Sequence, residues 1–255
     1  MSEATPPASW PRPYWQPGED EVVLQFYVFG KFEPELRIPS LRYGSPGLPA
    51  GVEIQRFQNA VLRQWEGYPL NGALGGLIKE DTPEAYEAAR IAPEVLVVRG
   101  VLKDAASLDY LRDTLGVLAG MLDVGGTAIL DPQILTLFTA DHWRRHYLVK
   151  DGAPPRNHVL ILRSDEGGDR SWVHTRGMRK FGRPDLSLRN VPERDLDRAG
   201  MLCEKLVELL SLGAHFSAGQ QLDVDGIPGG LVAQPGGSLD DPEFNNTHVE
   251  FRWAG

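Results

Sequence analysis

The stretch EVLVVRGVLK, over residues 94–103, decides the fold, because a mostly continuous apolar run of this length is typical of a buried strand. Leucines then recur every three or four residues, as expected for one buried helix face: Leu108, Leu111, Leu115, Leu118 and Leu122. Gly125 and Gly126 end this helix, and the apolar residues 127–130 predict a returning strand. The stretch therefore predicts a strand–helix–strand unit.

A second stretch, SWVHTRGMRK over residues 171–180, has a similar pattern. The helix that follows it carries Ala199, Cys203, Leu206 and Leu210 at similar spacing, and residues 213–217 are expected to return as a strand. The distance from strand to helix is longer in the second stretch than in the first, so an inserted loop is expected within residues 181–194. We take 94–131 and 171–222 as candidate repeats, with a chance match between two leucine-rich helices as the alternative.

Alternation and helical spacing also predict elements outside these repeats. The strands are expected over residues 21–29, 158–163 and 248–253, and helices within 51–68 and over 135–148. Together these patterns predict an α+β fold, with a mainly antiparallel central sheet and helices on one face.

Proline and aromatic residues are concentrated over residues 1–20, and such a segment forms neither a helix nor an inner strand. We expect an extended N-terminal arm there, pinned to the rest of the protein by Trp10, Tyr14 and Trp15. Residues 21–255 are expected to form a single α+β domain.

The composition limits the partners and the compartment. A net charge of −9 disfavours binding to nucleic acid, whose phosphates require clustered cations. A basic protein partner is electrostatically compatible, although solubility alone also accounts for a moderately acidic surface. With a single cysteine, no apolar run long enough to span a bilayer and no signal-like start, the sequence predicts a cytoplasmic protein without membrane contact.

His142 and His146 suggest a metal pair, because residues four apart share one face of a helix. A zinc protease motif would also need glutamate at the position held by Trp143, and a third ligand would have to come from elsewhere, such as His158 or His174. The alternative is a helix end whose cationic residues complement the helix dipole. That alternative is favoured, and no cofactor is predicted.

The run from His174 to Asp185 is the leading candidate for a binding surface, because it turns at two glycines and is rich in cations. Such a loop can present arginine forks to a carboxylate or phosphate. The alternative is a solvated strand-to-helix connection whose phenylalanine fills the core. The candidate binding residues are His174, Arg176, Arg179, Lys180, Phe181 and Arg183.

The same run carries a family resemblance. WVHTRGM (residues 172–178) followed by FGRPD (residues 181–185) resembles a pattern of bacterial domains of unknown function related to predicted toxin-immunity proteins. The resemblance covers residues 93–222. It implies an α+β protein that acts by binding and has no established catalytic residues.

No strong catalytic motif accompanies these patterns. The sequence lacks the Gly-x-Ser-x-Gly elbow, and Cys203 falls on an apolar helix face, where a thiol is inert. We therefore expect a non-enzymatic, immunity-like module that binds another protein. The alternative is a metal-dependent hydrolase that uses His142 and His146 to activate water.

Overall fold

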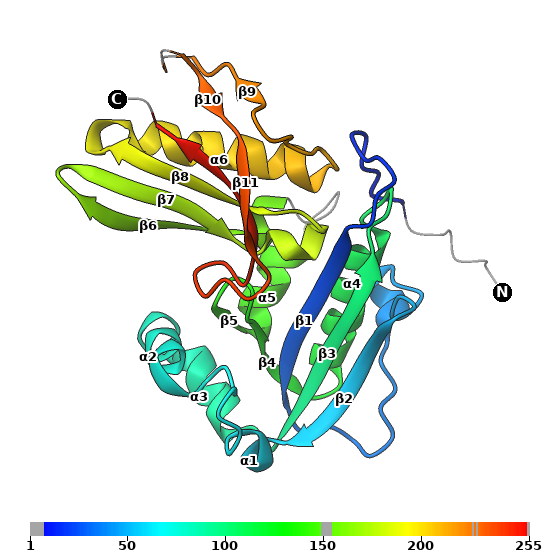
Figure 1. The fold of residues 1–255 in the computed structure, drawn as a ribbon. Coiled ribbons are helices and arrows are strands. Elements are labelled where there is room, and N and C mark those ends of the chain that lie inside the picture. The colour runs from blue at the N-terminus through cyan, green and yellow to red at the C-terminus, as the bar shows by residue number, and fades with distance from the viewer. Residues whose placement is uncertain (1–7, 149–154, 226, 228, 254–255) are drawn as a thin grey trace. The chain divides into compact units, whose positions relative to one another are not determined.

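The computed structural model describes residues 8–148, 155–225, 227 and 229–253 (Figure 1). The chain groups into two compact units. Unit 1 comprises residues 1–11, 23–102 and 107–153, and unit 2 comprises residues 12–22, 103–106 and 154–255. Residues 21–255, expected from sequence to form a single domain, belong to both units, and the single-domain interpretation stays a prediction.

Unit 1 is built on a five-stranded sheet with the strand order β2-β3-β1-β4-β5. Its strands are β1 (Glu21–Gly30), β2 (Val52–Gln58), β3 (Glu94–Lys103), β4 (Gly126–Asp131) and β5 (Thr136–Thr139). The pairs β2–β3, β1–β4 and β4–β5 are antiparallel. The predicted apolar strand thus lies inside the sheet as β3, between β2 and β1.

Helices cover both faces of this sheet, and the alternation of strand side chains explains why. Val28 lies on the face that packs against the C-terminal part of α4 (Asp109–Asp123), whereas Tyr27 and Phe29 point to the opposite face. There they join a buried cluster with residues of α2 (Gly72–Asp81) and α3 (Pro83–Ile91). Figure 1 shows α4 on one side of the sheet and α2–α3 on the other. The prediction of helices on one face is therefore wrong for this unit.

Two predicted helices of unit 1 begin later than expected. Within 51–68, the chain first forms β2 and then only the short α1 (Asn59–Leu62). Within 135–148, it first forms β5 and then α5 (Ala140–Tyr147). In both places the apolar residues fit either a helix or a strand that pairs with a buried neighbouring strand. The pairing in the folded protein selects the strand.

Unit 2 contains a second five-stranded sheet, with the order β11-β12-β8-β7-β6. Its strands are β6 (Leu160–Gly167), β7 (Arg170–Arg176), β8 (Asp185–Pro192), β11 (Gln234–Ser238) and β12 (Asn246–Arg252). All pairings are antiparallel except β12 with β8, which is parallel. The short strands β9 (Gln221–Leu222) and β10 (Leu231–Val232) form a separate pair. The α+β class with a mainly antiparallel sheet is confirmed.

The helix α6 (Leu196–Ser211) packs on β7 and β8 and begins the long connection from β8 to β12 (Figure 1). Its buried residues include the four that the spacing predicted, Ala199, Cys203, Leu206 and Leu210. Short 3-10 turns complete the fold: η1 (Ser40–Tyr43) in unit 1, and η2 (Pro155–His158), η3 (Met178–Phe181) and η4 (Glu193–Asp195) in unit 2.

The candidate repeats 94–131 and 171–222 share a strand and a long helix but differ around them. The region 181–194, expected to be an inserted loop, contains the strand β8, so β8 rather than β7 immediately precedes α6. The strand expected over 213–217 is absent. Gly213 has a φ of 104°, and a Cβ there would lie 2.5 Å from the Trp15 backbone, so the chain turns there instead of extending.

The N-terminal arm is described from residue 8; it contains no helix and turns at residues 13–14, where the Trp15 N–H donates to the Arg12 carbonyl (3.1 Å). In unit 1, the Trp10 N–H donates to the Asp109 carboxylate (2.8 Å). In unit 2, the Tyr14 N–H donates to the Leu212 carbonyl (3.1 Å), while the Tyr14 side chain is exposed. Within the described residues, no helix is both long and apolar enough to cross a bilayer.

Candidate functional site

The loop between β7 and β8 carries the candidate binding residues predicted from sequence, and two glycines shape its path. Gly177 and Gly182 have φ values of 116° and 61°, which L side chains rarely adopt. They flank η3 and turn the chain back towards β8. These turns bring the positively charged side chains of the loop into one region of unit 2, where they are buried or half-buried.

Arg183 is one of the two buried cations of this loop, and its guanidinium has several protein partners. Its Nη1 donates to the Asp104 carboxylate (2.7 Å), and its Nε and Nη2 donate to the carbonyls of Ala214 (3.0 Å) and Gly213 (2.9 Å). The Arg183 side chain is fully shielded from solvent and that of Asp104 is 3% exposed. A guanidinium with these partners stabilises the loop and is not available to a ligand.

Arg12, from the N-terminal arm, completes the same cluster. Its Nη1 forms an ion pair with Asp104, its Nε donates to Ser211 (2.8 Å) and its Nη2 donates to Phe181 (2.9 Å), in both cases to the main-chain carbonyl. The Trp15 indole N–H also donates to Asp104 (3.0 Å). A buried arginine, which the aromatic-anchor prediction did not include, thus holds the arm beside Trp10 and Trp15.

Lys180 and Phe181 are both fully buried. The Phe181 ring packs edge-on against the buried His158, with ring centroids 5.9 Å apart. The burial of this phenylalanine fits the alternative interpretation, but Lys180 and Arg183 are buried rather than solvated, and the connection leads to the strand β8 rather than to a helix.

Arg176 and Arg179 hold the loop that precedes β12. Arg176 Nη1 donates to the Glu243 carbonyl (2.7 Å), and Arg179 Nη1 donates to the Asn245 carbonyl (3.2 Å). These bonds fix the neighbouring Phe244, which is buried. Both arginines therefore donate hydrogen bonds to main-chain carbonyls of the same chain.

Asp185 ends the loop and is fully buried. One carboxylate oxygen accepts hydrogen bonds from the Thr175 hydroxyl (2.9 Å) and the Met178 N–H (3.3 Å), and the other accepts from the Asn246 amide (2.8 Å). Burial raises the pKa of Asp185 to about 7 despite these donors. The proline–aspartate end of the motif is thus a structural joint between β7, β8 and β12.

His174 belongs to an aromatic cluster on the sheet face opposite α6. Its ring stacks on Trp172 at a centroid distance of 3.8 Å, and Phe244 packs edge-on against both. Arg189 lies over the other side of this assembly, 3.8 Å from the Trp172 ring centre. Burial, with Arg176 and Arg189 nearby, lowers the pKa of His174 to about 4, so the ring is neutral at physiological pH.

The strand register brings Ser187 between His174 and Glu250 on this face. A nucleophilic triad instead requires the histidine between the serine and the acid, so that it can accept the serine proton. Here the Ser187 hydroxyl accepts a hydrogen bond from the Trp172 indole (2.9 Å) and is 1% exposed. The arrangement favours packing over acyl-transfer chemistry.

The predicted binding residues therefore lie in one region of unit 2, but the contacts described above are with other residues of the same chain. His174, Lys180, Phe181 and Arg183 are buried, and Arg176 and Arg179 are half-buried with backbone partners. Their role in binding a ligand stays a prediction.

His142 and His146 lie on α5 with their ring centroids 6.1 Å apart. Both rings pack against the Phe138 ring, with centroid distances of 5.2 Å for His142 and 5.4 Å for His146. His142 also lines a hollow of about 410 Å³ with Asp81, Glu84 and other residues. Among the described residues, no group of three or more His, Cys, Asp or Glu side chains is placed to hold a metal ion. The metal-pair hypothesis stays a prediction that the geometry does not support further.

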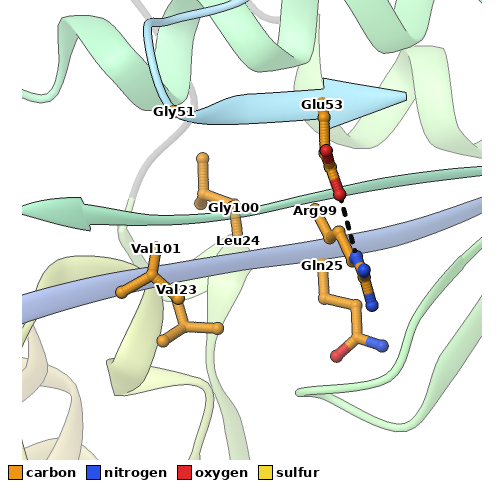
Figure 2. A pocket seen from close by; sticks show the side chains of 8 residues that line it. All are labelled: Val23, Leu24, Gln25, Gly51, Glu53, Arg99, Gly100 and Val101. Atoms are coloured by element: carbon orange, nitrogen blue, oxygen red, sulfur yellow. Dashed lines mark hydrogen bonds and ion pairs between the residues drawn. The ribbon is translucent and has the colours of Figure 1, made fainter. Parts of the chain in front are cut away.

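A second hollow, of about 390 Å³, lies on the sheet of unit 1 and was not predicted from sequence. Figure 2 shows the side chains of Val23 and Val101 at one end of it and the Glu53–Arg99 pair at the other. The Arg99 Nε donates to Glu53 at 3.3 Å. Val101 is 56% exposed.

The hollow exists because α2 and α3 cover only half of this sheet face. Val95 and Val97 lie under the helices in the buried cluster, whereas Arg99 and Val101 continue the same face beyond it. The sequence signal is the change within 94–103 from continuous apolar residues to alternation after Val98. Alternation is typical of a strand with one open face.

The hollow offers several kinds of contact at once. Two valines provide apolar area, Gln25 provides an amide, and Glu53 and Arg99 provide opposite charges. It contains no nucleophile or histidine among its lining residues. Such a mixed, shallow surface is suited to recognition rather than to bond-breaking chemistry.

No protein-family model, curated protein or solved structure matches this chain. The resemblance carried by WVHTRGM and FGRPD stays a prediction, and the function has to be argued from the geometry.

Proposed function

We propose that this chain is a non-enzymatic protein-binding module, and that the open half of the unit 1 sheet is the surface it presents to its partner. The observation that carries the proposal is the hollow beside the Glu53–Arg99 pair, where Val101 is exposed on the sheet. Exposed apolar side chains on a well-ordered element, bordered by polar groups, are a common feature of protein interfaces.

The partner that we propose is a basic protein, which this chain occludes in the manner of an immunity protein of the bacterial cytoplasm. The net charge of −9 supports a basic partner, because opposite charges accelerate encounter and disfavour wrong partners. The buried engagement of the cationic loop in unit 2 also supports it, because those arginines are not displayed to an acidic partner.

The experiment compares two aspartate substitutions in affinity capture from the organism that encodes the chain. Val101→Asp places a charge in the hollow, whereas Leu41→Asp places the same charge at another exposed position of unit 1, where the side chain is 77% exposed. We expect capture to fall at least about tenfold with Val101→Asp and to persist with Leu41→Asp, since a buried unpaired charge costs several kcal/mol at an interface.

Both variants must retain the melting temperature of the wild type, which separates a lost surface from a lost fold. Equal capture by the wild type and Val101→Asp would remove the hollow from the proposal. Failure of all forms to retain any protein would contradict the binding function itself.

A further inference from the structure

The edges of the two five-stranded sheets differ in how they are protected. An edge strand exposes unpaired N–H and C=O groups, and proteins commonly blunt it with proline, bulges or short length. In unit 2, β11 contains Pro235, Gly236 and Gly237, and β6 has a register shift between Asp165 and Gly167. In unit 1, the edge strand β5 has four residues.

The remaining edge strand, β2, has none of these features. Its sequence, VEIQRFQ, contains no proline or glycine, and its seven pairs with β3 keep one register from Val52–Gly100 to Gln58–Glu94. Each of its two charged side chains forms an ion pair with a residue of β3. Glu53 pairs with Arg99, and Arg56 pairs with Glu94 at 2.8 Å. Each charge thus has an opposite partner within the sheet, and Glu53 keeps 58% of its side chain exposed.

The phase of the ladder shows which backbone groups of β2 face outward. The Asn59 N–H donates to Pro93 O (3.0 Å), so this pair is a hydrogen-bonded pair of the antiparallel ladder. Hydrogen-bonded and non-bonded pairs alternate. The backbone groups of Ile54 and Arg56, which fall at non-bonded positions, therefore point away from β3.

No backbone hydrogen bond takes up these outward groups within the described residues. The segment around Phe32 reaches β2 through a side chain instead: the Arg56 guanidinium donates to the carbonyls of Phe32 (2.6 Å) and Glu33 (2.8 Å). At the start of the strand, the Val52 N–H donates to Pro49 O (3.1 Å), so the free edge begins after Val52.

This edge borders the proposed binding surface. Gly51 and Glu53 line the hollow, and Figure 2 shows β2 as its rim beside β3. A strand added to β2 would extend the floor of the hollow and lie next to Glu53, whose side chain is 58% exposed. On the other face of the sheet it would meet the half-buried Ile54.

We propose that β2 is a docking edge, and that an extended basic segment of the partner protein pairs with it as an additional strand. The inference rests on the proposed function and specifies its mode of recognition. Main-chain bonds to Ile54 and Arg56 supply affinity in such a complex, and alternate side chains supply specificity. Lysine or arginine on one face would meet Glu53, and aliphatic residues on the other would meet Ile54.

The test uses the ¹⁵N-labelled full chain and a blocked heptapeptide in which lysine and valine alternate, with a glutamate–valine heptapeptide as its charge-reversed control. We expect saturable slowing of amide hydrogen exchange at Ile54 and Arg56, and at least about tenfold weaker binding of the acidic peptide. The inward amides of Glu53 and Gln55 already bond to β3 and should change little.

Two substitutions of the same residue test whether peptide binding depends on the backbone N–H of β2. Ile54→Pro removes an outward N–H, which an edge strand tolerates, and should abolish peptide binding, whereas Ile54→Val should retain it. Should Ile54→Pro fail to fold, Gln58→Pro serves instead, because the φ of −72° at Gln58 already suits proline.

Absence of saturable protection, or equal binding by Ile54→Pro, would overturn the inference. Protection of the β2 amides that depends on protein concentration without peptide would also overturn it, since the occupant would then be a second copy. If Ile54→Pro still captures the natural partner while Val101→Asp does not, strand pairing fails and the proposed function survives.

Discussion

Arg183 and Asp104 are joined at 2.7 Å in a part of unit 2 that is closed to water, although 78 residues separate them along the chain. Arg12 forms an ion pair with the same carboxylate from the arm. Asp104 thus pairs with two buried guanidinium groups, and the arm, the cationic loop and the segment 103–106 meet at this one carboxylate.

Asp104→Asn should lower the free energy of unfolding by about 3–5 kcal/mol, because removing one partner leaves buried charge uncompensated. Urea denaturation followed by tryptophan fluorescence measures the loss. Arg163→Ala is the matched control, since its pair with Glu193 is half exposed on both sides and should contribute about 1 kcal/mol or less. Equal effects of the two substitutions would show that the buried cluster is not a stabilising joint.

His174→Gln should change how stability depends on pH. The folded protein keeps the pKa of His174 at about 4, below its ordinary value of 6.5, so between these values the unfolded chain binds more protons. This residue therefore makes the wild type lose stability as pH falls from 6.5 to 4. Urea midpoints across this range should show the cost of His174→Gln shrinking towards acid pH; a constant cost would contradict the buried neutral ring.

Asp185→Asn should cost about 1–3 kcal/mol, because an amide group would face the donors of Thr175, Met178 or Asn246. The pH effect has the opposite sign to that of His174. The folded pKa of about 7 lies above the ordinary 3.8, so stability from this group is present at low pH and is lost as pH rises through 7.

The cost of Asp185→Asn should therefore be larger at pH 4 than at pH 8, measured by urea denaturation at both values. Asp197→Asn, at an exposed position, should show little cost at either pH. A cost that grows towards pH 8 would show that the carboxylate is the stabilising form.

The Cys203 thiol should be unreactive in the native protein. It is fully buried on α6, and burial raises its pKa to about 12, so almost no thiolate is present at neutral pH. Ellman's reagent should label it only after denaturant is added. Fast labelling of the native protein would mean that α6 opens readily.

Purified, untagged protein should contain no stoichiometric metal by elemental analysis, because the His142 and His146 rings pack on Phe138 without a described third ligand. The double variant His142→Ala/His146→Ala provides the comparison. One equivalent of metal in the wild type that is lost in the variant would revive the hydrolase alternative.

Part of the candidate site was accessible from sequence. The run 174–185 was recognised as distinctive, and the expectation that Phe181 fills the core fits its burial, whereas the buried Arg183 does not fit a solvated connection. The engagement of Arg183 could not be predicted, because its partner Asp104 lies in a distant segment with no local pattern. The unit 1 hollow was missed, although the alternation after Val98 signalled an open strand face.

The sequence by itself determined the elements whose hydrophobic period is unambiguous: the strand at 94–103, the helix that ends at Asp123 and the buried face of α6. Periodicity is a local property, since each side chain's direction follows from the backbone of its own element. Only the tertiary structure decided the order of strands, the division into two units and the use of the loop cations. A charge is solvated or paired according to which distant segments pack around it, and no local pattern records that choice.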